Sequence, residues 1–174
     1  MNTFTYTLKS ETIFYKGCVF DSLLELKYVL MIEDSHAWLR DGLEIYHGLN
    51  KIPSGLKCHL PCYRPDLLIR NWETRKATLI EIKPDEYDCY ELLERKKVAA
   101  RFIKGFGYDW TYQIVYDSEI FLTAGQWLRY NDILTSQDDW QHQPCLAMLQ
   151  NNSSFSDRQY EQFVRTGVLP ALIP

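Results

Sequence analysis

Asp66, Glu81 and Lys83 are residues of this chain whose types and spacing suit catalysis. Asp66 follows a proline, and fifteen residues later Glu81 and Lys83 stand two apart in the segment EIK. Side chains two apart on a β-strand face the same side, so Glu81 and Lys83 should project together while Ile82 faces the opposite layer. Acids and a lysine gathered in this way can handle metal ions and phosphates.

The two halves of this motif lie on strands that we expect to pair. The pattern predicts strands over residues 63–70 and 76–83, joined at 71–75 by a connection of hairpin length. A symmetric hairpin makes the numbers of paired residues add to about 146 and places Asp66 beside or diagonal to Glu81, with roughly 5–8 Å between their Cβ atoms.

Two carboxylates at that distance repel each other unless a cation, a shared proton or solvent intervenes. Magnesium prefers carboxylate oxygens and also binds substrate phosphates, so we expect Asp66 and Glu81 to bind one or two Mg2+ ions, with Mn2+ as a substitute. Lys83 can orient or deprotonate an attacking water and stabilise negative charge in the transition state. This chemistry is metal-assisted phosphodiester hydrolysis. The alternative is that Lys83 pairs structurally with Glu81 or with the turn at Asp85 and Glu86.

Glu25 is a further candidate metal ligand, on a helix that we expect over residues 22–33. At about 100° per residue it falls beside the apolar Val29 and Ile32, on the face directed toward the sheet. An inward acid at this place can add a third carboxylate. Ser22 offers Glu25 a competing role, because a serine N-cap and a glutamate three residues later form a capping box that needs no metal.

The order of the expected elements, strand-strand-helix-strand after an initial helix, indicates an α/β sheet and excludes a bundle or a sandwich. Beyond the segments above, we expect strands over 3–7, 12–20, 43–47 and 110–116, a turn and connector over 34–41, a loop over 48–62, and a helix over 86–104. The composition changes near residue 125. We therefore divide the chain into a catalytic domain at 1–124 and a C-terminal extension at 125–174, with one or two helices and a partner-binding role.

The net charge argues against a protein that binds nucleic acid through an overall excess of positive charge. The chain carries 19 basic and 23 acidic residues, and phosphate contacts dominate that kind of affinity. A local basic face or a partner protein can still supply affinity for nucleic acid. Lys97, Arg101 and Lys104 recur at i, i+4 and i+7 on the second long helix and are candidate DNA contacts. The alternative is a solvated face in which Glu94 pairs with Lys97.

Several features favour a cytoplasmic protein without a membrane segment. No apolar run approaches the ~20 residues that span a bilayer. Residues 1–9 lack the basic and apolar regions of a signal peptide. The five cysteines are scattered and odd in number, which fits a reduced compartment better than a disulfide framework.

These motifs resemble the signature of the PD-(D/E)XK nucleases. Within that superfamily they look most like the N-terminal catalytic domain of TnsA-type transposon endonucleases. The resemblance covers roughly residues 10–122. It rests on the helix start FDSLLE at 20–25, on YRPDLLI at 63–69, on LIEIKP at 79–84, and on the strand YQIVY at 112–116 after a long helix and a glycine-containing turn.

The resemblance implies a restriction-endonuclease-like fold, with a mixed central sheet flanked by helices, and magnesium-dependent nicking of DNA. It implies that Glu25, Asp66 and Glu81 are the metal-binding acids, that the main-chain carbonyl of Ile82 is a further ligand, and that Lys83 is the catalytic lysine. TnsA proteins act with a transposase subunit to free the 5′ ends of the element, so the resemblance also implies such a partner.

Two other functions fit the same residues. One is a free-standing defence or repair nuclease of the superfamily, which would cut DNA without partners. The other is a non-catalytic protein that keeps the nuclease fold and binds other proteins through its aromatic-rich extension.

Overall fold

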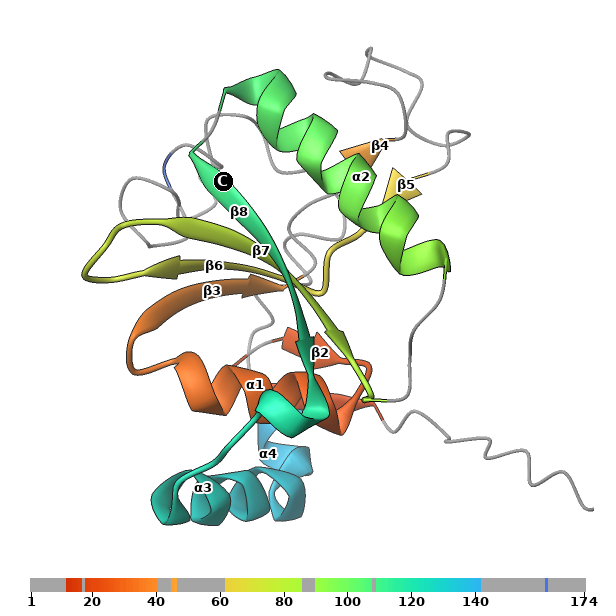
Figure 1. Cartoon of the computed structure of the whole chain (residues 1–174). Coiled ribbons are helices and arrows are strands. Elements are labelled where there is room, and N and C mark those ends of the chain that lie inside the picture. The colour runs from red at the N-terminus through yellow and green to blue at the C-terminus, as the bar shows by residue number, and fades with distance from the viewer. Residues whose placement is uncertain are drawn as a thin grey trace, which may run out of the picture.

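The structure, a computed structural model, describes residues 12–16, 18–40, 45–46, 62–85, 90–107, 109–141 and 162. A four-stranded mixed sheet lies between two helical layers (Figure 1). The α/β class expected from the order of elements is therefore confirmed, and the mixed central sheet flanked by helices agrees with the fold that the resemblance implies. The strands expected over 3–7, and most of the loop expected over 48–62, lie outside the described residues.

The central sheet has the strand order β3-β6-β7-β8. The first three strands are antiparallel, and β7 and β8 run parallel because the long helix α2 carries the chain across between them. The bounds are β3 (His36–Arg40), β6 (Leu67–Asn71), β7 (Ala77–Lys83), α2 (Tyr90–Phe106) and β8 (Trp110–Tyr116).

The other described elements flank this sheet (Figure 1). They are the hairpin strands β1 (Ile13–Tyr15) and β2 (Cys18–Phe20), the helix α1 (Leu23–Ile32), the short strand pair β4 (Ile45–Tyr46) and β5 (Cys62–Tyr63), the 3-10 turn η1 (Asp117–Glu119), and the helices α3 (Ala124–Thr135) and α4 (Gln137–Gln141).

Alternation along the strands divides the core into two layers. One face of the sheet packs against α2 through residues that include Leu68, Leu79, Val98, Ala99 and Phe102. The other face packs against α1 and the β1–β2 hairpin through residues that include Phe20, Leu26, Leu67, Ile80 and Ile82. Ile82 thus faces α1 while its neighbour Glu81 contacts α2, as the sequence predicts.

Three elements differ from the expectation. The strand expected over 12–20 is divided into β1 and β2, which pair antiparallel. Residues 34–41 were expected as a turn and connector, but residues 36–40 form the edge strand β3, with Ala37 and Leu39 buried on the α2 side. The segment does alternate between buried and less buried positions, but its many polar residues obscure this pattern in the sequence. The strand expected over 63–70 is broken, because Tyr63 belongs to β5 and β6 begins only at Leu67. Pro65 lies in the gap, where its missing N–H cannot join a ladder.

The described part of the extension packs on the same core as the sheet. Tyr130 and Ile133 of α3 are buried among the residues that cover the α1 face. The Gln137 side chain accepts a 2.7 Å hydrogen bond from the Phe14 N–H of β1. Arg129 forms a 2.7 Å ion pair with Glu33 at the end of α1. One or two helices were expected within 125–174, with 156–166 as the best candidate. The structure places α3 and α4 at the start of that range, and the candidate at 156–166 lies outside the described residues except for residue 162.

Among the residues that the structure describes, no helix has the length and the apolar character needed to cross a membrane.

We predict that Ile133→Ala lowers the free energy of unfolding by about 2–5 kcal/mol, because it leaves a cavity in the core beneath α1. Leu128→Ala, at an exposed position of the same helix, should change it by much less. Urea unfolding followed by circular dichroism measures both values. Similar small losses in the two variants would contradict the packing of α3 as part of the domain core.

Candidate active site

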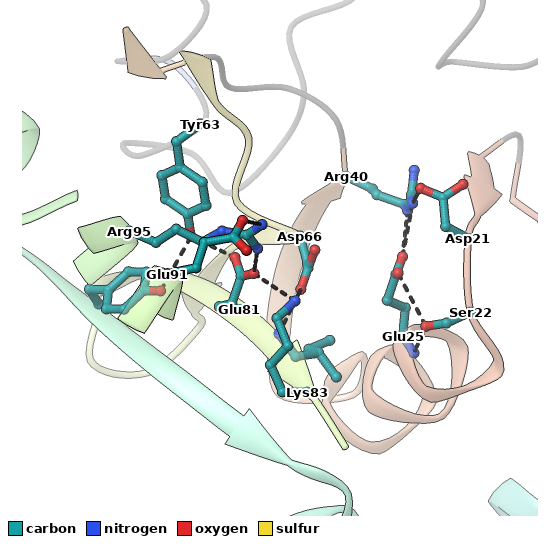
Figure 2. A network of polar contacts seen from close by, with 12 residues as sticks. Asp21, Ser22, Glu25, Arg40, Tyr63, Asp66, Glu81, Lys83, Glu91 and Arg95 are labelled. Carbon is teal, nitrogen blue, oxygen red and sulfur yellow. Dashed lines mark hydrogen bonds and ion pairs between the residues drawn. The ribbon is translucent and has the colours of Figure 1, made fainter. Parts of the chain in front are cut away.

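The end of β7 brings Asp66 and Glu81 together (Figure 2). Leu67 pairs with Ile80, so the register is one residue away from the symmetric hairpin, and continuing it places Asp66 directly opposite Glu81. Asn71 belongs to β6 and caps the turn, accepting hydrogen bonds from the N–H groups of residues 73 and 74, so the connection runs over 72–76, one residue later than expected.

Just before β6 begins, the Asp66 side chain takes the place of a backbone hydrogen-bond partner of β7. Its Oδ2 accepts a 2.6 Å hydrogen bond from the Ile82 N–H of β7. The last backbone pair is Leu67 with Ile80, so the strand edge next to it would otherwise lack a partner. The N–H and C=O of one strand residue point to the same side. The main-chain carbonyl of Ile82 is therefore directed to the side of β7 on which Asp66 lies.

Glu81 is a buried carboxylate surrounded by donors. It has 0% exposure. Its Oε2 accepts a 2.7 Å hydrogen bond from the Tyr63 hydroxyl, and its Oε1 forms ion pairs with Arg95 of α2 and with Lys83, the latter at 2.7 Å. Without such partners, the free-energy cost of burying this charge would be too large for a stable fold. The burial and the adjacent Glu81 charge together raise the pKa of the Tyr63 hydroxyl.

Asp66 has fewer partners than Glu81. Its side chain is 22% exposed, and Lys83, at 3.8 Å, is the cation within 4 Å of it among the described residues. In that same part of the chain, no residue forms a hydrogen bond with Oδ1. Burial, and secondarily the charge of Glu81, raise the pKa of Asp66 to about 7. The site therefore favours an additional cation or a proton at Asp66.

Lys83 bridges the two acids. Its ammonium lies 2.7 Å from Glu81 and 3.8 Å from Asp66, on the same side of β7 as Glu81. The structural ion pair with Glu81, which was the alternative interpretation of Lys83, is thus present. The other structural alternative was a pair with the turn at Asp85 and Glu86. Asp85 accepts a 2.9 Å hydrogen bond from the Ser118 N–H, and Glu86 lies outside the described residues.

Glu25 lies apart from this group and has its own partners (Figure 2). Its Oε2 pairs at 2.9 Å with Arg40 of β3, which also pairs at 2.8 Å with Asp21. Ser22 is the N-cap of α1 as expected. Its hydroxyl accepts from the Glu25 N–H and donates to Glu25 Oε1. Burial raises the pKa of Glu25, opposed by Arg40. Glu25 thus has a cationic partner in Arg40, and its charge also contributes to the raised pKa of Asp66. Its role as a metal ligand stays a prediction.

Sequence reasoning missed Arg40, Tyr63 and Arg95. Arg40 lay in a segment that was not expected to be a strand, although Trp38 and Arg40 alternate with Ala37 and Leu39. Arg95 pairs with Glu81 and also with Glu91, four residues earlier on α2. That i, i+4 spacing was the available signal. Nothing in the sequence indicated that the Tyr63 hydroxyl would reach Glu81.

The three candidate DNA contacts lie on the exposed side of α2. Lys97, Arg101 and Lys104 are all exposed, and Lys97 forms a 2.8 Å ion pair with Glu94. This pair is the one that the solvated-face alternative predicted. The charge of the helix surface is therefore partly neutralised at Lys97.

Asp66 and Glu81 are the two acids at this site that could offer a magnesium ion limited protein ligation. Within the described network three carboxylates, Asp66, Glu81 and Glu91, are paired with two cations, Lys83 and Arg95. Asp66 is the acid left with the most distant cation. No group of three or more His, Cys, Asp or Glu side chains that could hold a metal occurs in the described ranges. Magnesium is commonly bound by one or two carboxylates, with water and substrate phosphate completing its shell.

No protein-family model, curated protein or solved structure was found to match this chain. The resemblance to TnsA-type nucleases thus stays a prediction from the motif residues.

We predict that Asp66→Asn stabilises the protein above neutral pH in a metal-free buffer. The folded state raises the pKa of Asp66 to about 7. The contribution of protonated Asp66 to the free energy of unfolding is therefore fully present below about pH 4, and it is lost as the pH rises through about 7. Asparagine keeps the acceptor for the Ile82 N–H and carries no charge. The gain in unfolding free energy should be on the order of 2 kcal/mol at pH 8 and smaller at pH 5. Urea unfolding at both pH values measures it.

Asp109→Asn, at an exposed position just before β8, is the matched control for the change in net charge. An Asp66→Asn gain that is absent, or equal at the two pH values, would contradict the buried carboxylate described here.

We predict the opposite sign for Glu81→Gln. Removing this charge leaves Lys83 and Arg95 beside a neutral buried amide, and should lower the free energy of unfolding by about 3 kcal/mol. Glu91→Gln, which removes the exposed partner of the same arginine, is the control and should cause a smaller loss. Equal losses in the two variants, measured by urea unfolding, would show that the burial of Glu81 is not decisive.

Proposed function

We propose that this protein is a metal-dependent DNA endonuclease of the TnsA type, with its active site at the end of β7. The observation that carries the proposal is that Asp66 and Glu81, from adjacent strands, share the ammonium of Lys83, while Asp66 remains short of positive charge. A site that holds an acid with a raised pKa next to a buried acid is costly for stability and typical of function.

Each residue has a defined task in this proposal. Asp66 and Glu81 hold Mg2+ or Mn2+, and the carbonyl of Ile82 is a further donor directed to the same side. When bound, the metal supplies a Lewis acid that neutralises charge on the scissile phosphate. Lys83 orients the attacking water and stabilises the developing negative charge. Glu25 as a third ligand would require Arg40 to release it, so the proposal does not depend on Glu25.

The proposal includes a partner protein that supplies DNA affinity. The chain has a net charge of −4, and Lys97, the first of the three candidate DNA contacts on α2, is already paired with Glu94. A DNA-binding or transposase subunit is the partner that the TnsA resemblance implies. A free-standing nuclease is the alternative that needs no partner, and tight binding of duplex DNA by the isolated chain at physiological salt would favour it.

We predict that the protein nicks or cuts plasmid DNA with Mg2+ or Mn2+, and that Asp66→Ala and Lys83→Ala each reduce the rate at least about 100-fold. Asp66→Ala removes a metal ligand, and Lys83→Ala removes the cation that both acids share. Gel analysis of plasmid topology over time gives the rates.

Lys76→Ala, in the exposed turn at the opposite end of β7, is the matched control for the loss of a lysine and should cut like the wild type. Undiminished cutting by Asp66→Ala would refute the assignment of the site. If the wild type does not cut, titration calorimetry with Mn2+ decides. Binding to the wild type that is lost in Asp66→Ala supports a nuclease that needs its partner. No binding to either supports a non-catalytic protein.

A further inference from the structure

The two oxygens of Glu81 have different environments. Oε2 accepts one bond from the neutral Tyr63 hydroxyl, whereas Oε1 is shared by two cations, Lys83 and Arg95. Oε1 is also the oxygen that shares the ammonium of Lys83 with Asp66 (Figure 2). A divalent cation held jointly by Asp66 and Glu81 would therefore meet two positive charges on the Glu81 side.

Lys83 and Arg95 differ in how strongly the surrounding structure holds them beside Glu81. Lys83 stands on the same strand as Glu81 and serves both acids. Arg95 comes from α2, its side chain is 29% exposed, and its second nitrogen pairs with Glu91, which is 58% exposed. Its guanidinium also lies over the Tyr63 ring, 5.8 Å from the centroid. Arg95 can therefore leave Glu81 by side-chain rotation while Glu91 keeps it at the helix surface.

From this arrangement we infer that Arg95 is a resident counter-ion of Glu81 that competes with the divalent cation for Oε1. The inference rests on the proposed metal site and concerns its regulation. While no metal is bound, Arg95 neutralises Glu81 and offsets the free-energy cost of burying its charge. When the ion binds, the Arg95 side chain must turn toward Glu91. Arg95 is thus a positioning residue that lowers metal affinity and sets the metal concentration at which the site fills.

The test is calorimetric titration of the full chain with Mg2+ and with Mn2+ at one fixed ionic strength. Arg95→Met removes the charge and keeps an apolar side chain over Tyr63. It should tighten metal binding at least about tenfold, because a nearby unit charge repels a divalent ion strongly in a partly buried site. Arg95→Lys retains the charge and should stay within about threefold of the wild type. Lys96→Met, at the next and exposed position of α2, is the matched control and should leave the affinity unchanged.

Circular dichroism establishes that each variant is folded. If Arg95→Met does not fold, Arg95→Gln, whose amide can still donate to Glu81, takes its place in the titration. Metal binding that is unchanged or weaker in the folded neutral variant, with the wild type binding normally, would overturn the inference and leave the proposed function standing. Absence of Mg2+ and Mn2+ binding in both the wild type and the neutral variant would overturn the proposed function as well.

Discussion

The burial of the Glu81 carboxylate is the constraint on which the rest of this site depends. A fully buried charge is tolerated only when cations and donors surround it. Here those partners come from three different elements: Tyr63 from β5, Lys83 from β7 and Arg95 from α2. Because the Glu81 carboxylate needs Arg95 as a partner, α2 is held against the end of the central sheet. The carboxylate also draws the short β4–β5 pair to the same face.

Asp66 faces the same cluster with the opposite balance. Its carboxylate is held by a main-chain N–H of β7 and lies 3.8 Å from an ammonium that Glu81 holds more closely. Pro65 explains this placement, because the chain cannot continue the ladder there and the Asp66 side chain substitutes for it. The fold thus places one acid whose charge is satisfied next to one whose charge is not, and the second is the natural position for a cation from solution.

A second polar cluster supports the opposite face of the sheet. Glu33 at the end of α1 accepts from the Tyr15 hydroxyl and pairs with Lys16 and with Arg129 of α3. This cluster joins the β1–β2 hairpin, α1 and the extension, so that face carries a structural ion network and the α2 face carries the candidate chemistry. Strand alternation along β7 sends Ile82 to the α1 layer and Glu81 to the α2 layer.

Local patterns in the sequence determined the α/β class, the strand at 110–116, the Ser22 cap and the positions of Asp66, Glu81 and Lys83 at the ends of paired strands. Those features depend on two- and 3.6-residue periodicities and on spacing within a hairpin, which are local properties of a chain. Only the tertiary structure decided that residues 36–40 form an edge strand, that Arg40 pairs with Glu25, and that Arg95 pairs with Glu81 while the Tyr63 hydroxyl donates to it. The partner of a buried charge is whichever side chain lies beside it in space, and residues distant in the chain meet there only after the sheet and helices have packed.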